Sequence, residues 1–255
     1  MLGKLMKHDI KNMGKLLLPL NVIVLLMSLV GSILRVSGLF DLENATPLFG
    51  ILLVTYIIGM AVIAVVAFFY PIIYFYRHLF SRQGYLTFTL PVCSWKILFS
   101  KTIVGYCWYL INIGVALFSI WAITGFLRIP EMHLTNLNLY SREYIGMSFT
   151  AFMWWAVALT IFSLFYTLLS AYVSIAIGQL WSKHKIVGSI VAYLVIYTIV
   201  QILVTFTILP FLFGGFDVGR MVLVSFYASI IIGVILSVIF YITSGIILKK
   251  KVNLD

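Results

Sequence analysis

The sequence predicts an all-α integral membrane protein with six transmembrane helices, forming one domain over residues 1–255. Two observations predict this class. A composition that is 63% hydrophobic excludes an ordinary water-soluble domain. In addition, six apolar segments contain no Asp, Glu, Lys or Arg, and each is longer than the roughly 18 residues that mark a membrane span. These segments are residues 16–34, 48–76, 102–127, 146–180, 186–213 and 221–248.

The positive charge falls on alternate polar gaps between these segments. We number these polar gaps from the N-terminus and count the two terminal stretches as the first and the last. The odd-numbered gaps hold 13 of the 17 Lys and Arg residues: Lys4, Lys7, Lys11, Lys15, Arg77, Arg82, Lys96, Lys101, Lys183, Lys185, Lys249, Lys250 and Lys251. Basic residues in short loops mark the cytoplasmic side. We therefore expect a multi-pass protein of the plasma membrane with both termini in the cytoplasm. The basic surface would face anionic membrane lipids rather than nucleic acid.

The elements follow from the chain in order. Residues 1–15 alternate lysines with apolar residues at helical spacing, which predicts an amphipathic helix lying in the inner membrane interface. The span 48–76 is about 43 Å long as a helix, so it must tilt, bend near Pro71 or extend into the cytoplasm. The span 146–180 is also too long for one straight crossing.

The cytoplasmic gap 77–101 keeps aromatic and aliphatic residues among its charges, which indicates a structured segment rather than a free loop. Ser94, Trp95 and Lys96 follow Pro91 and could begin a short amphipathic helix. In the outer gap 214–220, a glycine pair is more typical of a turn than of a helix-packing motif.

The chemistry of known catalytic sites is missing from the sequence. The four histidines are scattered over different gaps, no metal-ligand cluster occurs, and no Gly-rich nucleotide loop is present. We therefore expect no catalysis, no metal and no bound cofactor in this chain. Cys93 and Cys107 lie in a cytoplasmic loop and inside a span, which favours neither a disulfide nor a metal site.

The polar residues inside the spans are amides and hydroxyls, so no ionisable group of an ion-coupled carrier is expected there. Such amides either join helices to each other or line a substrate path. Aromatic side chains on the fourth span either face lipid or a partner, or contact an amphipathic cargo. The candidates for a substrate path are Asn21, Asn112, Phe152, Trp155 and Gln201.

Three stretches resemble permease subunits of the type-2 ABC exporter family, as found in Firmicutes. The first is Gly84-Tyr85-Leu86-Thr87-Phe88-Thr89-Leu90-Pro91-Val92 with Trp95-Lys96-Ile97-Leu98 and Ser100-Lys101. The second is the start Met1-Leu2-Gly3-Lys4-Leu5-Met6-Lys7 followed by Pro19. The third is Ala176-Ile177-Gly178-Gln179-Leu180 with Lys183-His184-Lys185. The resemblance covers the whole six-span layout and does not identify the substrate.

The resemblance implies a role for each part of the chain. The segment between the second and third spans would be a coupling helix that docks on a separate ABC ATPase subunit, which supplies ATP and Mg. The resemblance assigns this coupling role to Arg82, Gly84, Tyr85, Leu86, Phe88, Leu90, Pro91, Trp95, Lys96 and Lys101 of this chain. A second permease, identical or related, would complete the pathway. The family often has re-entrant helices before the sixth span, for which the gap 214–220 leaves little room.

Two functions from different classes follow. The first is a permease subunit of an exporter that moves an amphipathic or lipid-like substrate, such as a drug, an antimicrobial peptide or a lipid. The second is a non-transporting immunity or sensor protein that binds a peptide at the outer face. In the coupling segment, the exposed apolar side chains either dock on a partner or pack against the inner ends of the chain's own spans.

Overall fold

The computed structural model describes residues 2–36, 47–81, 84, 93–124, 131–181, 184–213 and 218–250, and within them the chain is helical without any strand. Six helices are long and apolar enough to cross a membrane, which confirms the predicted class. They are α1 (Leu2–Val36), α2 (Pro47–Phe80), α4 (Ser94–Thr124), α6 (Phe149–Gly178), α7 (Lys185–Phe213) and α8 (Val218–Lys250). A shorter helix, α5, covers Glu131–Ile145.

The surfaces of these six helices remain apolar. Even in α6, whose apolar 18-residue stretch is the most buried of the six, only 33% of that stretch is buried. Large apolar side chains are exposed on each of the six helices. A soluble monomer rarely exposes contiguous apolar patches above a few hundred Å². Lipid is therefore the solvent that these surfaces require, and the chain is a multi-pass membrane protein.

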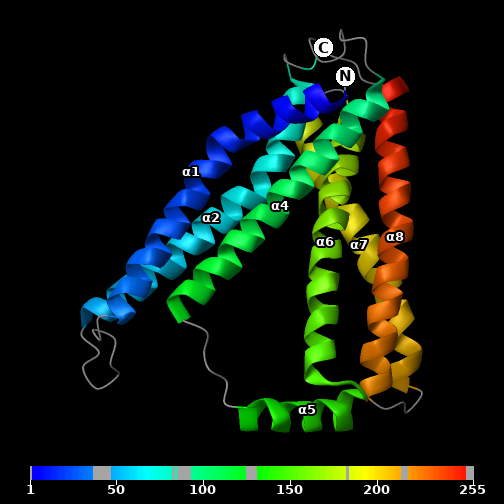
Figure 1. Ribbon diagram of the computed structural model, residues 1–255. Coiled ribbons are helices and arrows are strands. Elements are labelled where there is room, and N and C mark those ends of the chain that lie inside the picture. Colours follow the sequence, from blue (N-terminus) through cyan, green and yellow to red (C-terminus); the bar gives the residue numbers. More distant parts are fainter. Residues whose placement is uncertain are drawn as a thin grey trace. The chain divides into compact units, whose positions relative to one another are not determined.

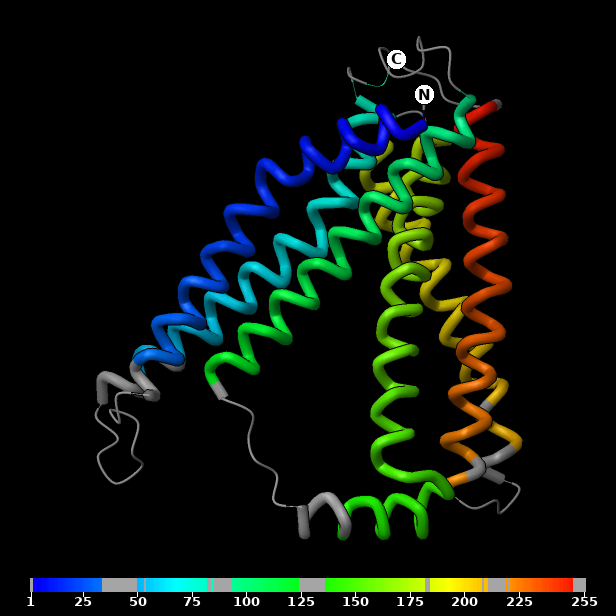
Figure 2. Tube along the Cα trace, viewed as in Figure 1, coloured from blue at the N-terminus to red at the C-terminus, as the bar shows by residue number. Residues whose placement is uncertain are grey.

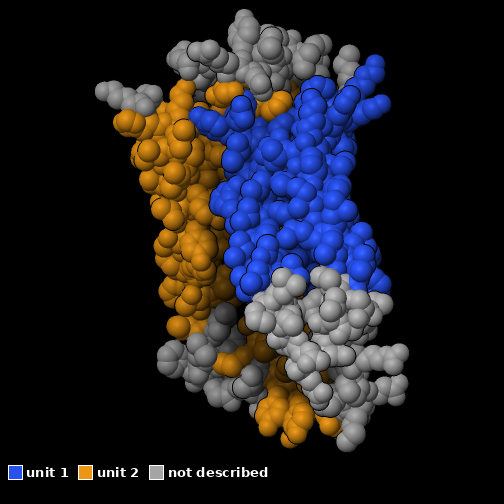
Figure 3. All heavy atoms as spheres, turned by 90° about the vertical axis from the view of Figure 1, so that its left-hand side faces the viewer, with its two compact units in different colours: residues 1–77, 99–128 blue, residues 78–98, 129–255 orange. Residues whose placement is uncertain are grey.

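The chain divides into two compact units, coloured blue and orange in Figure 3. Unit 1 consists of Met1–Arg77 and Phe99–Arg128, and unit 2 of His78–Leu98 and Ile129–Asp255. Unit 1 thus holds α1, most of α2 and most of α4, whereas unit 2 holds α5 to α8 and the first turn of α4.

In unit 1, helices α1, α2 and α4 run side by side (Figure 1). Contacts at one end join the start of α2 to the end of α4, where Tyr56 Oη and Ser119 Oγ lie 2.6 Å apart. Nearby, a Cβ atom at Gly31 would lie 3.1 Å from Cγ1 of Ile123, so α1 and α4 also approach closely there. The helix α2 is therefore antiparallel to both of its neighbours.

In unit 2, ring pairs join α6 to α8 at matching heights, and the two helices are parallel. Phe152 packs on Phe226, Trp155 on Tyr227 and Tyr166 on Phe240, with ring centroids 5.4–5.7 Å apart. The hairpin from α6 to α7 is tight, because a Cβ at Gly178 would lie only 2.1 Å from Oγ of Ser189. Helix α5 lies across the N-terminal end of α6 (Figure 1).

Three features differ from the sequence-based expectations. Residues 2–15 of the predicted amphipathic segment are helical, but they are continuous with the first span inside α1 rather than a separate interfacial helix. Figure 2 shows α1 curving in its N-terminal half, where Pro19 cannot donate the backbone hydrogen bond to Lys15. Helix α4 begins at Ser94 and is one helix with the third span, so the short helix expected after Pro91 is its first turns.

The third difference is α5, which lies between the predicted spans 102–127 and 146–180, where the sequence predicts no helix. Elsewhere the expectations hold: α6 and α7 match the predicted spans 146–180 and 186–213 closely. Helix α7 runs without interruption to Phe213, so residues 205–213 continue this helix and do not form a separate re-entrant helix.

Candidate functional site

The first turns of α1 bury one acidic side chain. Buried or half-buried residues recur every three or four positions along this helix, and they are Leu2, Met6, Asp9, Met13 and Leu17. Asp9 falls in that stripe and is 1% exposed. The four lysines between these positions are exposed. The helix therefore turns a carboxylate, together with its apolar residues, toward the other helices of unit 1.

Three side chains from α2 and α4 satisfy this carboxylate. Lys101 Nζ forms an ion pair with Oδ1 of Asp9, and both side chains are 2% exposed. Tyr74 Oη donates to the same oxygen at 2.9 Å. Ser100 Oγ donates to Oδ2 at 2.9 Å. We call Asp9, Tyr74, Ser100 and Lys101 the charged cluster.

The cluster is built so that each charge has compensation. The ammonium of Lys101 also lies 4.5 Å from the centre of the Tyr74 ring, where the negative face of the ring attracts a cation. Desolvating two charges is costly, and attraction offsets that cost only when hydrogen bonds satisfy the remaining atoms. The two hydroxyls supply those bonds, so the three helices are joined at one point.

The cluster lies near one end of the helices rather than at their middle. Lys101 is the eighth residue of α4, about 10 Å along the helix from its first residue. Asp9 is similarly close to the start of α1, and Tyr74 to the end of α2. Ion-coupled carriers place ionisable groups near the membrane midplane. This position favours a joint between helices over an ion relay.

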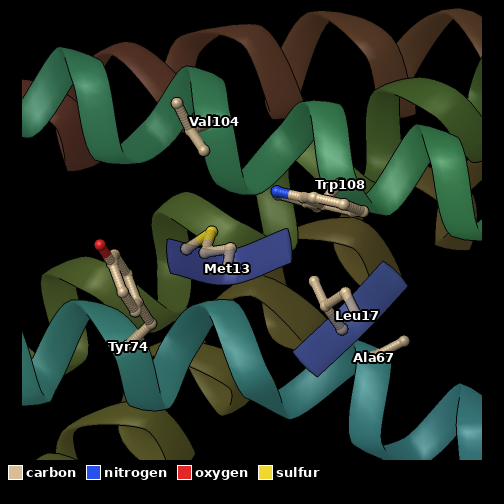
Figure 4. Packing of buried hydrophobic residues seen from close by; sticks show 6 residues of the cluster. All are labelled: Met13, Leu17, Ala67, Tyr74, Val104 and Trp108. Atoms are coloured by element: carbon tan, nitrogen blue, oxygen red, sulfur yellow. The ribbon is translucent and has the colours of Figure 1, made fainter. Parts of the chain in front are cut away.

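An apolar layer adjoins the charged cluster. It consists of Met13, Leu17, Ala67, Tyr74, Val104 and Trp108, which converge from α1, α2 and α4 (Figure 4). Gly14 lets α1 approach α4 here, because a Cβ at this position would lie 3.1 Å from Cζ2 of Trp108. The packed side chains of this layer cover one side of the charged cluster.

Of the predicted substrate-path residues, Asn21 and Asn112 bind each other. Asn21 Nδ2 donates to Asn112 Oδ1 at 2.8 Å, joining α1 to α4 inside unit 1. This is the helix-joining alternative left open by the sequence. Asn112 Nδ2 has no hydrogen-bond partner, and one turn away on α4 the same holds for Nε1 of Trp108.

The other three candidates for a substrate path belong to unit 2. Phe152 and Trp155 on α6 pack against rings of α8. Gln201 Nε2 donates to Tyr197 Oη on its own helix at 2.8 Å, and the side chain is exposed. The five residues are thus engaged in separate contacts within two units, and the structure does not gather them into one site.

The predicted coupling residues are only partly described. Arg82, Tyr85, Leu86, Phe88, Leu90 and Pro91 lie outside the described residues. Gly84 is buried, and its N–H donates to the carbonyl of Ser81 at 2.7 Å. Lys96 is exposed. Lys101 is enclosed in the charged cluster, so its contacts are internal rather than with a docking partner.

Trp95 also has an internal contact. Its ring lies 5.6 Å from the Tyr241 ring on α8, and Tyr241 Oη donates to its carbonyl at 3.4 Å. A Cβ at Gly245 would lie 2.3 Å from Cζ3 of Trp95, so the indole rests directly on the α8 backbone. For Trp95, therefore, the structure supports packing against the chain's own spans.

Sequence reasoning missed the charged cluster because the distribution of Lys and Arg over the polar gaps does not single out Asp9. One signal could have found it: Asp9 is an acidic residue on the apolar stripe of a helix that otherwise carries lysines. Among the described residues no group of three His, Cys, Asp or Glu could hold a metal ion, and Cys93 and Cys107 are free.

The comparisons with known proteins leave the site to be interpreted from its own geometry. No protein-family model, no curated protein and no solved structure matches this chain.

Proposed function

We propose that this protein is the membrane-spanning permease subunit of an ATP-driven exporter of the type-2 ABC kind. One observation carries the proposal: the base of the segment 77–101 is fixed by side-chain contacts at two points of one helix. Trp95 packs on α8, and Lys101, six residues later on α4, pairs with Asp9 of α1.

These two contacts suit a segment that receives a push from an ATPase. A coupling element can transmit movement only if its base does not yield, since a flexible base would absorb the displacement. The first turns of α4 are continuous with the third span. Movement of the segment would thus reach α8 through Trp95 and α1 through Asp9, in addition to α4 itself.

The concentration of Lys and Arg in the odd-numbered gaps supports the membrane orientation that this function requires. With the lysine-rich gaps in the cytoplasm of a plasma membrane, the segment 77–101 would face the compartment that contains ATP. The sequence has no nucleotide-binding loop, so ATP and Mg would be bound by a separate ATPase subunit. A second permease, identical or related, would complete the pathway.

The proposed cargo is amphipathic or lipid-like. The described parts of the spans present apolar and aromatic surfaces, and the buried ion pair is already neutralised by its own partners. A surface of this kind attracts apolar groups and offers no fixed charge to an ion or a polar solute.

The test begins with a search of the reading frames that neighbour that of this chain for an ABC ATPase. The two proteins are then co-expressed and purified in lipid nanodiscs. We expect the two subunits to purify together, the complex to hydrolyse ATP and the lone chain to show no hydrolysis. Hydrolysis by the lone chain would contradict the proposal. Absence of any ATPase complex, combined with binding of a peptide at the outer face, would favour the sensor function instead.

A matched pair of variants then tests the coupling path. Trp95→Ala removes the contact with α8, whereas Trp154→Ala removes an indole that is 74% exposed on α6. We expect Trp95→Ala to keep the complex and its ATP hydrolysis while cargo transport falls, and Trp154→Ala to resemble the parent. Equal transport by both variants would exclude Trp95 from the path.

A further inference from the structure

Helix α5 is held in a fixed orientation at the end of unit 2. Asn138 Oδ1 accepts a hydrogen bond from the N–H of Phe149 at 3.0 Å, which ties α5 to the first turn of α6. Gly146 makes the turn between the two helices with a φ of +78°, a conformation that favours glycine. A Cβ at Gly219 would lie 2.8 Å from the backbone of Ile145, so the start of α8 closes on the end of α5.

These contacts define which side of α5 faces the rest of the unit. Asn138, Ser141 and Ile145 are spaced by three and four residues and are buried or half-buried. They therefore form the side that rests on the ends of α6 and α8. The orientation of the remaining sides of α5 follows, because the helix cannot rotate without breaking the bond to Phe149.

An apolar stripe lies beside that buried side. Leu137, Tyr140 and Tyr144 fall within about 60° of each other around the helix. All three are exposed, Tyr140 and Tyr144 by 63% and 64%. Glu143 is also exposed, and it lies on a different side of the helix, together with Leu139. The exposed surface of α5 is thus amphipathic.

The position of α5 in the chain indicates what covers this stripe. Only residues 146–148 separate it from the membrane-spanning helix α6, so α5 lies at the level where that span meets the membrane boundary. Trp154, about 8 Å along α6 from its first residue, exposes its indole at this end of the span. Trp and Tyr gather at membrane–water boundaries, where an apolar ring contacts acyl chains and a polar atom stays hydrated.

We propose that α5 is an interfacial helix that inserts Leu137, Tyr140 and Tyr144 into the lipid headgroup region of the leaflet at which α6 begins. With the predicted orientation this is the outer leaflet. Trp154 of α6 is exposed near the same membrane boundary, and Glu143 would remain in water. A helix of this kind typically buries its apolar side about 5–10 Å into the boundary between headgroups and acyl chains. The proposal does not depend on an ATPase partner.

The test is a nitroxide scan of α5 in the full chain, reconstituted in nanodiscs of phosphatidylcholine and phosphatidylglycerol. Cys93 and Cys107 are first replaced by Ser, since both are free and exposed. Single labels are then placed at residues 137, 140 and 144 on the stripe, and at 139 and 143 as controls. Power saturation measures collisions with oxygen, which concentrates in lipid, and with a water-soluble nickel chelate.

We expect the ratio of oxygen to nickel collisions to be several-fold higher at the stripe than at the controls. The comparison of 140 with 139 is the most stringent, because the side chains are adjacent and their exposed fractions are nearly equal, 63% and 60%. Equal ratios at both sites would overturn the proposal. Low collision rates with both reagents at 137, 140 and 144 would also overturn it, since they would mean that protein, such as a second copy or a bound peptide, covers the stripe.

Discussion

Asp9 and Lys101 depend on each other, because each is the countercharge that makes the burial of the other tolerable. Removing one partner of a buried ion pair leaves an uncompensated charge and typically costs about 3–5 kcal/mol. Removing both and replacing them by groups of similar shape is often nearly neutral. The two side chains belong to α1 and α4 and are 92 residues apart in the chain.

We therefore predict that Asp9→Asn and Lys101→Met each lower the free energy of unfolding by several kcal/mol, whereas the double variant recovers most of the loss. Unfolding of the purified protein in mixed micelles measures all three. The matched control is Lys7→Met, which removes an exposed lysine from the same turns of α1. Additive losses in the double variant would show that the two side chains are not coupled.

The charged cluster also shows which features of single residues could not be predicted from the sequence. Counting charges by gap predicts that Asp9 and Lys101 lie on the same side of the membrane, but it does not reveal which way a side chain faces. Asp9 lies on the buried stripe of α1, whereas its apolar neighbour Ile10 is 46% exposed. The pairing itself is a contact between distant positions, which helical periodicity within one segment cannot report.

At the scale of the elements, the contact between α4 and α8 is tightly packed. A methyl group at Gly245 would lie 2.3 Å from the ring of Trp95, which is closer than two non-bonded carbon atoms can approach. Overpacking of a well-filled contact typically costs about 1–3 kcal/mol. By contrast, a Cβ at Gly114 on α4 would meet nothing within 4 Å.

We predict that Gly245→Ala lowers the melting temperature of the purified protein, whereas Gly114→Ala leaves it unchanged or raises it, since alanine favours a helix over glycine by about 1 kcal/mol. Adding Trp95→Leu to Gly245→Ala should restore part of the loss by making room. Thermal unfolding followed by circular dichroism measures these shifts. A stable Gly245→Ala variant would mean that α8 does not rest on the Trp95 ring.

The elements that could be predicted are those whose formation is decided locally. An uncharged apolar run of more than 20 residues becomes a helix in lipid whatever surrounds it, because its backbone must be satisfied internally. This is why the span 186–213 reappears almost unchanged as Lys185–Phe213. Helix α5 contains six charged, His or Asn residues among its 15 and has no such run. Its position depends on Asn138, Gly146 and Gly219, contacts that hydropathy does not report.

For the whole molecule, the testable quantity is the orientation of the six spans. The odd-numbered gaps together carry a net charge of +11 with Asp9 and Asp255 included, and the even-numbered gaps carry −1. The translocation machinery retains short basic loops in the cytoplasm. The charge difference therefore predicts that the gaps at 77–101 and 181–185 are inside, and that α5 is outside.

We predict that a membrane-impermeant maleimide added to intact cells labels Glu143→Cys on α5 and fails to label His184→Cys between α6 and α7. Both positions are exposed, and the background lacks Cys93 and Cys107. A permeant maleimide, or lysis before labelling, should label both variants and serves as the control for reactivity. Labelling of position 184 on intact cells would reverse the assignment of the two sides.

The joint between Asp9 and Lys101 also sets an order of events while the chain is being made. The ribosome has to add 92 more residues after Asp9 before its partner exists, which at typical rates of synthesis takes about 5–20 s. During that interval the first two membrane helices are completed, while the carboxylate of Asp9 still lacks Lys101, the partner with which it pairs in the folded protein. The three helices of unit 1 can therefore join at this end only after the start of α4 has been made, although this end contains the first residues to be synthesised.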